Sequence, residues 1–329
     1  MGDFERRVLQ LVADGKITPA EGDELLHARD KGPLNDLRGI VEGGIADMHR
    51  VVRDVTEDRS VEILDSPLEV SDEPLTLRVT GDYGLRIQPS GAGTCRAVWR
   101  VGRALFGDSA EPPQVRLEGR TLYVESRSRM RFGWSFSGAT LDVYVPSSTV
   151  LAGSIAQRNG RVELGGLSVG DLQIEALNGR VQIEVPVLND LAVESRNGSI
   201  KVFAGQGRRL KVDAANGRVA IQGTLQDIDA TTHNGGITAD LGAVRGGRCQ
   251  LHTVNGSVSM ELPADVAVDL RAETVHGPLA VDVRGLSIAE DIRDYTRRRL
   301  HGRVQGGTGD IAAEVRSTNG AVRITQRLR

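Results

Sequence analysis

The dipeptide Asn-Gly recurs at nearly constant spacing through the second half of this chain of 329 residues. It occurs seven times, at Asn159, Asn178, Asn197, Asn216, Asn234, Asn255 and Asn319. His276-Gly277 stands where a further Asn-Gly is due, and the successive steps are 19, 19, 19, 18, 21, 21 and 43 residues. Internal periods of this length are typical of repeat architectures, in which each repeat is one supersecondary unit.

Apolar residues recur at fixed distances from each asparagine. Around Asn178, Leu172 and Ile174 stand six and four residues before it, and Val181 and Ile183 stand three and five residues after it. The positions between them are mostly polar. Alternation with a period of two on both sides of a turn predicts two short strands in each repeat, with one buried face. The residue two positions before the asparagine is small in seven repeats, at Ala176, Ser195, Ala214, Thr232, Thr253, Thr274 and Ser317.

Two topologies fit this pattern. Asn-Gly between alternating strands is a strong hairpin signal, and successive hairpins would form an antiparallel meander or barrel. Equivalent residues that recur every 18 to 21 positions instead favour stacked coils. The same residue class holds in each column over eight repeats, which a meander does not require. We therefore predict a mostly β fold, a parallel β-helix or solenoid whose core is completed by stacking. We expect the corner to need positive φ, which both Asn and Gly tolerate.

Composition limits the classes of function. The net charge is −3 and the pI is near 6.1, so the chain has no global basic field and a nucleic-acid partner is not expected. No stretch approaches 18 apolar residues, and the first residues lack the apolar core of a secretion signal. The two cysteines are too few for a disulfide framework. We expect a cytoplasmic protein, peripheral to the membrane if it contacts one.

A small helical module is predicted before the solenoid. Phe4, Val8 and Leu11 share one helical face, and Thr18-Pro19-Ala20-Glu21 is a capping box with proline at the first helical position. A module of this size buries too little surface to be stable alone, so we expect it to dock or to associate. The predicted segments are a docking or oligomerisation module at 1–56 and a β-solenoid at 60–329, with irregular first coils at 60–150, regular coils at 151–285, a helical insertion at 286–303 and a last coil at 304–329.

Three groups of residues are candidates for function. Turn geometry explains the asparagine column, so we interpret it as structural. Glu175, Glu194 and Asp213 fall in one outward column that could bind a cation or a basic peptide, although nearby Lys and Arg residues offset them. An Arg-rich loop with aromatic residues could bind anionic lipid or a peptide; its candidate residues are Arg127, Arg129, Arg131 and Trp134.

Other patterns favour solvated or buried side chains over sites. Arg293 and Arg297–Arg299 could contact phosphate groups, but a solvated helical face is the simpler interpretation. Cys249 falls in an inward column and is predicted to be a buried thiol. The six His and two Cys show no metal-ligand spacing, and no catalytic fingerprint is present. We therefore predict no enzymatic activity, no metal and no cofactor.

Two parts of the sequence resemble known bacterial families. The start, Val8-Leu9-Gln10-Leu11-Val12-Ala13-Asp14-Gly15-Lys16-Ile17-Thr18 with Glu24-Leu25-Leu26, resembles the SHOCT-like helical module. Leu141-Asp142-Val143-Tyr144-Val145-Pro146, followed by the Asn-Gly column, resembles the "putative adhesin" β-strand-repeat family. Together they cover nearly the whole chain, and the pairing is similar to LiaX-type envelope-stress proteins. The resemblance implies a right-handed, single-stranded β-helix with a helical docking module. It also implies a non-enzymatic role in sensing or buffering envelope stress.

Two classes of function stay open. In the first, the protein is a binding and regulatory module whose partners are a membrane-associated regulator, a cationic peptide or anionic lipid. In the second, it is a self-assembling structural protein whose partner is a second copy. Self-assembly needs uncapped terminal coils, because an open strand edge templates pairing, whereas a binding module is expected to be capped.

Overall fold

The computed structural model describes residues 59–69, 71–101, 111–126, 139–307 and 309–327. The predicted helical module and the Arg-rich loop lie outside these residues. The chain divides into two units, the first made of Met1–Val61, Arg100–Glu111 and Met130–Ala139, the second of Glu62–Trp99, Pro112–Arg129 and Thr140–Arg329. The described residues form 22 strands, and none of them belongs to a helix long and apolar enough to cross a membrane.

The strands follow one another with short connections. They are β1 (Arg59–Pro67), β2 (Leu75–Gly81), β3 (Gly84–Ser90), β4 (Thr94–Val101), β5 (Gln114–Glu118), β6 (Thr121–Glu125), β7 (Ala139–Pro146), β8 (Val150–Asn159), β9 (Val162–Gly165), β10 (Ser168–Asn178), β11 (Val181–Asn197), β12 (Ile200–Asn216), β13 (Val219–Asn234), β14 (Ile237–Leu241), β15 (Gly247–Asn255), β16 (Val258–Leu262), β17 (Val266–His276), β18 (Leu279–Asp282), β19 (Ser287–Arg293), β20 (Arg298–Val304), β21 (Gly309–Asn319) and β22 (Val322–Gln326).

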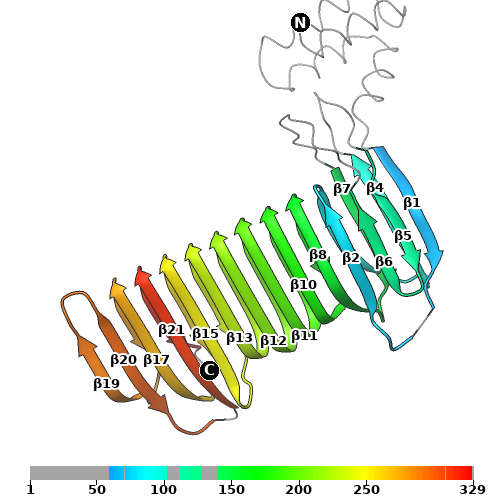
Figure 1. Cartoon of the computed structure of the whole chain (residues 1–329). Helices are drawn as coiled ribbons and strands as arrows, with labels where there is room; N and C mark the ends of the chain where they lie inside the picture. Colours follow the sequence, from blue (N-terminus) through cyan, green and yellow to red (C-terminus); the bar gives the residue numbers. More distant parts are fainter. Residues whose placement is uncertain (1–58, 70, 102–110, 127–138, 308, 328–329) are drawn as a thin grey trace, which may run out of the picture. The chain divides into compact units, whose positions relative to one another are not determined.

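The repeats stack as parallel coils in two columns of strands. The first column contains the strands that end at the Asn-Gly corner, and Figure 1 shows many of them side by side. Its order is β6, β2, β8, β10, β11, β12, β13, β15, β21 and β17. The second column contains the strands that follow the corner, in the order β7, β3, β9, β11, β12, β13, β14, β16, β22 and β18. The predicted parallel solenoid is confirmed, and a meander of hairpins is excluded.

The apolar columns of the sequence form the core. Val181, Ile200 and Val219 are stacked in register on successive coils, and each is 0% exposed. The columns before the corner are buried in the same way, as at Ile174 and Val193. Burial of a Val or Ile side chain contributes about 1.5–3 kcal/mol, so the stability of a coil depends on the coils above and below it.

The order of the coils departs from the order of the sequence at both ends of the stack. The coil of β2 and β3 lies between the coil of β6 and β7 and that of β8 and β9. At the other end, the coil of β21 and β22 lies between the coil of β15 and β16 and that of β17 and β18 (Figure 1). The last Asn-Gly repeat therefore forms an internal coil.

Antiparallel strands flank the first column. At one end β5 pairs antiparallel with β6. At the other end β20 pairs antiparallel with β17, and β19 pairs antiparallel with β20. The predicted helical insertion at 286–303 is therefore wrong, because these residues form the hairpin of β19 and β20. The hairpin pairs the backbone groups of β17, which a helix would have left as an open edge.

The Asn-Gly corner is held by close packing of the backbone. The expected positive φ is found at corner glycines, with 109° at Gly160 and 152° at Gly179, and within the described residues glycine alone adopts it. The glycines allow neighbouring coils to approach each other. A Cβ atom built on Gly198 would lie 1.7 Å from the carbonyl oxygen of Gly179. The amides of the corner glycines from Gly160 to Gly256 also donate to the asparagine carbonyl of the next coil, as from Gly179 to Asn197 at 2.9 Å.

Candidate binding surfaces on the solenoid

The seven asparagines form one continuous side-chain ladder. Each Nδ2 donates to the Oδ1 of the asparagine on the preceding rung, over 2.8–3.0 Å. The rungs follow the order of the stack, so Asn319 donates to Asn255. At the first rung Asn159 donates to Asp82, a residue that sequence analysis did not single out. Because Asp82 lies in Gly81-Asp82-Tyr83-Gly84, without Asn-Gly, this corner carried little signal in the sequence.

A second line of hydrogen bonds lies inside the same corner. The hydroxyl groups of Thr253, Ser317 and Thr274 donate to glycine carbonyl oxygens at the corner of the neighbouring coil, over 2.8–2.9 Å. These residues are at most 3% exposed. The small inward residue predicted before each asparagine thus has a second role where it carries a hydroxyl group, because it satisfies a backbone carbonyl. Both ladders stabilise the corner, which leaves the outer side-chain faces free to vary.

The acidic column predicted from the sequence is present on the outer face of the first strand column. Glu175 pairs in register with Glu194, and Glu194 with Asp213. Gln173 donates to Glu175 over 3.0 Å, and Lys211 lies 3.2 Å from Asp213. The hydrogen bond to Asp213 raises the pKa of Lys211. Among the described residues Glu194 has no ion pair, although its charge also contributes to the raised pKa of Lys211.

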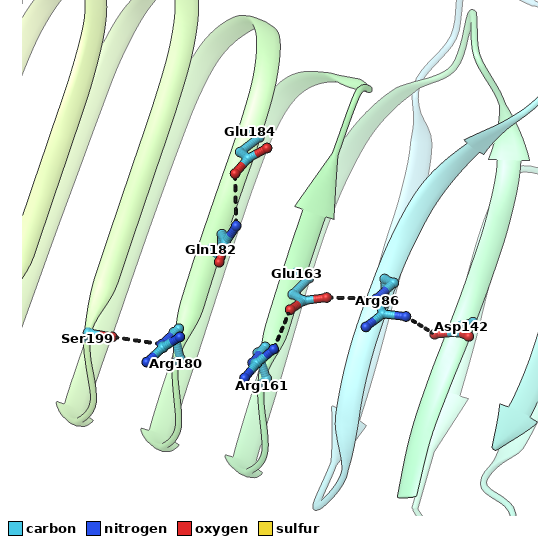
Figure 2. Close-up of polar contacts among 8 residues, drawn as sticks. All are labelled: Arg86, Asp142, Arg161, Glu163, Arg180, Gln182, Glu184 and Ser199. Atoms are coloured by element: carbon cyan, nitrogen blue, oxygen red, sulfur yellow. Dashed lines mark hydrogen bonds and ion pairs between the residues drawn. The ribbon is translucent and has the colours of Figure 1, made fainter. Parts of the chain in front are cut away.

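The outer face of the second column carries a mixed network (Figure 2). Arg86 lies between Glu163, 2.7 Å away, and the buried carboxylate of Asp142, 3.6 Å away. Arg161 reaches Glu163 over 2.9 Å. Burial raises the pKa of Glu163, but the hydrogen bonds from Arg86 and Arg161 outweigh this effect and lower it. Next along this face, the exposed Arg180 donates to the hydroxyl of Ser199, over 3.2 Å.

The terminal hairpin is held to β17 by charge. Arg297 donates to Glu273 over 2.6 Å, and Arg299 to the same carboxylate over 3.3 Å. His301 and Arg303 contact Asp269 over 2.9 and 3.0 Å. The sequence had suggested phosphate contact as one use of Arg297–Arg299. In the structure, two of these three arginines serve the ion pairs that dock the hairpin.

The remaining sequence candidates have no described role in a site. Arg127, Arg129, Arg131 and Trp134 lie outside the described residues. Cys249 is buried in its inward column, where burial raises the pKa of its thiol to about 12. No group of His, Cys, Asp and Glu in the described part of the chain is arranged to hold a metal ion.

A stack of parallel coils with an asparagine ladder at one corner defines a β-solenoid repeat protein. The family model "Toastrack DUF4097" matches residues 105–325, so the chain belongs to this family. A SHOCT-like domain model matches residues 3–33. No curated protein matches the chain.

Several solved bacterial structures are similar to this chain at low identity. A "putative cell adhesion protein" from Clostridium sporogenes is 8% identical, covers 82% of this chain and 100% of its own, and has a TM-score of 0.24. A "putative lipid binding protein" from Parabacteroides distasonis is 14% identical, with coverages of 83% and 97% and a TM-score of 0.38. A "putative adhesin" from Bacteroides fragilis is 12% identical, with coverages of 82% and 98% and a TM-score of 0.32.

Proposed function

We propose that this protein is a non-catalytic binding and regulatory protein of the bacterial envelope-stress response. Its solenoid is the ligand surface, and the segment matched by the SHOCT-like model, residues 3–33, is the arm that docks on a membrane-associated regulator. This assignment places it with LiaX-type proteins, on the cytoplasmic side of the membrane. Its two cysteines, Cys95 and Cys249, are free and buried, which suits a reducing compartment.

The closure of the first column is the observation that carries this proposal. Antiparallel β5 covers one end, and the hairpin of β19 and β20 covers the other. Every residue of β19 is exposed, but charged side chains and a register shift make it a poor template for another strand. In the second column β18, at the end of the hairpin, has only four residues, while at the other end β4 and then β1, of nine residues, follow β7. At the end of the hairpin, a self-assembling filament, the alternative function, would need longer open edges than these.

The acidic column is the proposed contact for a cationic peptide. Glu175, Glu194 and Asp213 lie on consecutive rungs, which are about 4.8 Å apart. Basic side chains along an extended peptide could meet these carboxylates in turn. Exposed ion pairs contribute only about 0.2–1 kcal/mol each, so affinity would come from several pairs and would weaken with salt. Anionic lipid, the other proposed ligand, would contact Arg127, Arg129 and Arg131.

A peptide titration tests the acidic column. A fluorescent cationic antimicrobial peptide is titrated with the full chain at low and at moderate salt. We expect salt-sensitive binding that the double variant Glu175→Lys/Glu194→Lys weakens about tenfold, because two attractive contacts become repulsive. The matched control is Glu118→Lys/Glu290→Lys, which changes the net charge equally at exposed positions on other strands. Equal loss in both variants would contradict a specific site.

Light scattering against protein concentration separates the two classes of function. A binding module should keep a constant mass after its docking arm is saturated or removed. A mass that rises continuously with concentration, together with no peptide binding, would favour the self-assembling alternative. Liposomes with and without anionic lipid, combined with reversal of Arg127, Arg129 and Arg131, test the lipid contact separately.

A further inference from the structure

Arginine side chains flank the asparagine ladder on four consecutive rungs. One column, two residues after each asparagine, holds Arg161, Arg180 and Arg218, with Ser199 between the last two. The residues of this column are neighbours across the coils. The amide of Val162, the residue after Arg161, donates to the carbonyl of Arg180 over 2.9 Å. A second column, directly before the asparagine, adds two more arginines. We call this set the arginine ridge; its members are Arg158, Arg161, Arg180, Arg196 and Arg218, and all are exposed.

The ridge is weakly compensated by carboxylates. Arg161 contacts Glu163, but within the described part of the chain the other four arginines have no ion pair. Some guanidinium groups elsewhere on the solenoid are instead neutralised by carboxylates on neighbouring rungs. Arg209, for example, lies 3.5 Å from Asp190 and 3.8 Å from Asp227. The ridge therefore concentrates positive charge along one corner of a protein whose net charge is −3.

The ladder between these arginines presents donors. Each Oδ1 from Asn159 to Asn255 already accepts a hydrogen bond from the next rung. Each side-chain amide has two N–H groups and uses one of them within the ladder. The second N–H remains on an exposed residue. The ladder thus leaves one side-chain N–H on each rung, in a line with guanidinium groups on both sides of it.

We propose that the arginine ridge binds a linear phosphate polymer that runs along the solenoid axis over the asparagine ladder. Rungs are about 4.8 Å apart, so the four rungs offer a charged line of about 14 Å. Guanidinium forks match pairs of phosphate oxygens, and the amide groups supply further donors. The arginines lie on both sides of the ladder, so they can contact a single polymer chain from two sides. A flat anionic surface would not be contacted in this way.

The neighbouring side chains limit the class of polymer that the ridge can bind. The ridge and the ladder contain no aromatic residue, and bases of single-stranded nucleic acids bind by stacking on aromatic rings. The favoured polymer is therefore one without bases. On the first strand column, Glu175 and Glu194 lie two residues nearer the start of their strands than the column of Arg158 and Arg196. These carboxylates repel an anion from that face and confine it to the corner. This proposal concerns a different surface from the peptide contact and does not depend on it.

Polyphosphate binding by the full chain tests the proposal. Calorimetry with inorganic polyphosphate is compared for the protein and for the triple variant Arg180→Gln/Arg196→Gln/Arg218→Gln. We expect at least about a tenfold loss of affinity, and a slope of log affinity against log salt that is shallower by about two, because each lost phosphate contact removes about 0.7–0.9. The control is Arg245→Gln/Arg248→Gln/Arg284→Gln, which removes the same charge at exposed positions away from the ridge. It should bind within about twofold of the unchanged protein, since only screened long-range charge is lost.

Each other outcome overturns the proposal. Absence of polyphosphate binding, or equal losses in both triple variants, would show that the ridge is not a site. Tighter ridge-dependent binding of single-stranded DNA would identify a nucleic-acid site instead. Binding of polygalacturonate, or of phosphatidylglycerol vesicles, without binding of polyphosphate would assign the ridge to carboxylate polymers or to lipid. Thermal melting followed by circular dichroism checks that each variant remains folded.

Discussion

Replacement of Gly198 by alanine would test whether the corner glycines set the spacing of the coils. The new Cβ atom would lie 1.7 Å from the carbonyl oxygen of Gly179, whereas an ordinary C···O contact is about 3.3 Å. The two coils would have to separate by more than about 1 Å to accommodate it. That movement would break the hydrogen bonds that join these two coils, from Gly179 to Asn197, at 2.9 Å, and from Val181 to Ser199, at 3.0 Å. The side-chain bond from Asn197 to Asn178, at 2.9 Å, would be lost with them.

The expected cost follows from these contacts. Three hydrogen bonds at about 1 kcal/mol each, with added cost for polar groups left unsatisfied, give a loss of about 3–5 kcal/mol in the free energy of unfolding. Urea unfolding followed by circular dichroism measures it. The control is Gly165→Ala in β9, where the added Cβ atom meets no atom within 4 Å and the change should be within about 0.5 kcal/mol. Similar unfolding midpoints for the two variants would refute the role assigned to the corner glycines.

Three further predictions use the same structure. Ile200→Asp should destabilise the protein by about 3 kcal/mol or more in urea melts, because it buries an unpaired charge, whereas Lys201→Asp next to it should cost less than about 1 kcal/mol. Burial raises the pKa values of Asp269 and Glu273, but their Arg and His partners outweigh it and lower both. Their contribution to stability should therefore be present above the ordinary values of 3.8 and 4.5 and be lost as the pH falls. Asp269→Asn/Glu273→Gln should flatten that part of an acid titration. A chain of residues 60–329 should keep its circular dichroism spectrum and lose a partner or an oligomeric state; unfolding would instead make the first residues a structural cap.

The sequence predicted the coils well because their chemistry repeats. Alternation around each asparagine assigns Val181 and Ile200 to the core without knowledge of the stack, and both are buried. The order of the coils was not predictable in this way, since every coil has the same columns and any two could stack. The hairpin of β19 and β20 was also missed. Every residue of β19 is exposed, so it lacks the alternation that marks a half-buried strand.

The arginine ridge shows another limit of sequence reasoning. Its members occupy two different columns and skip rungs, so no single position in the repeat is consistently basic. Only the stacking of Arg180 beside Ser199 and Arg218, with Arg196 across the ladder, brings them into one line. A site built from several repeats is visible when the residues are arranged by rung, and it is hidden when they are read in chain order.

The placement of β21 and β22 has a consequence for how the protein is made. Residues 266–304 leave the ribosome before residues 309–326, yet the later segment lies between β17 and β15. Ser317 in β21, for example, pairs with Thr274 of β17, 43 residues earlier, and with Thr253 of β15, 64 residues earlier. Growth of the stack by adding each coil as it is synthesised therefore stops at β15 and β16. The coil of β17 and β18 and its hairpin cannot take their final position until β21 and β22 have been synthesised. Alternatively, this coil docks first on β15 and is then displaced by β21. We expect a late, slow kinetic phase in folding, which truncation after residue 304 should abolish.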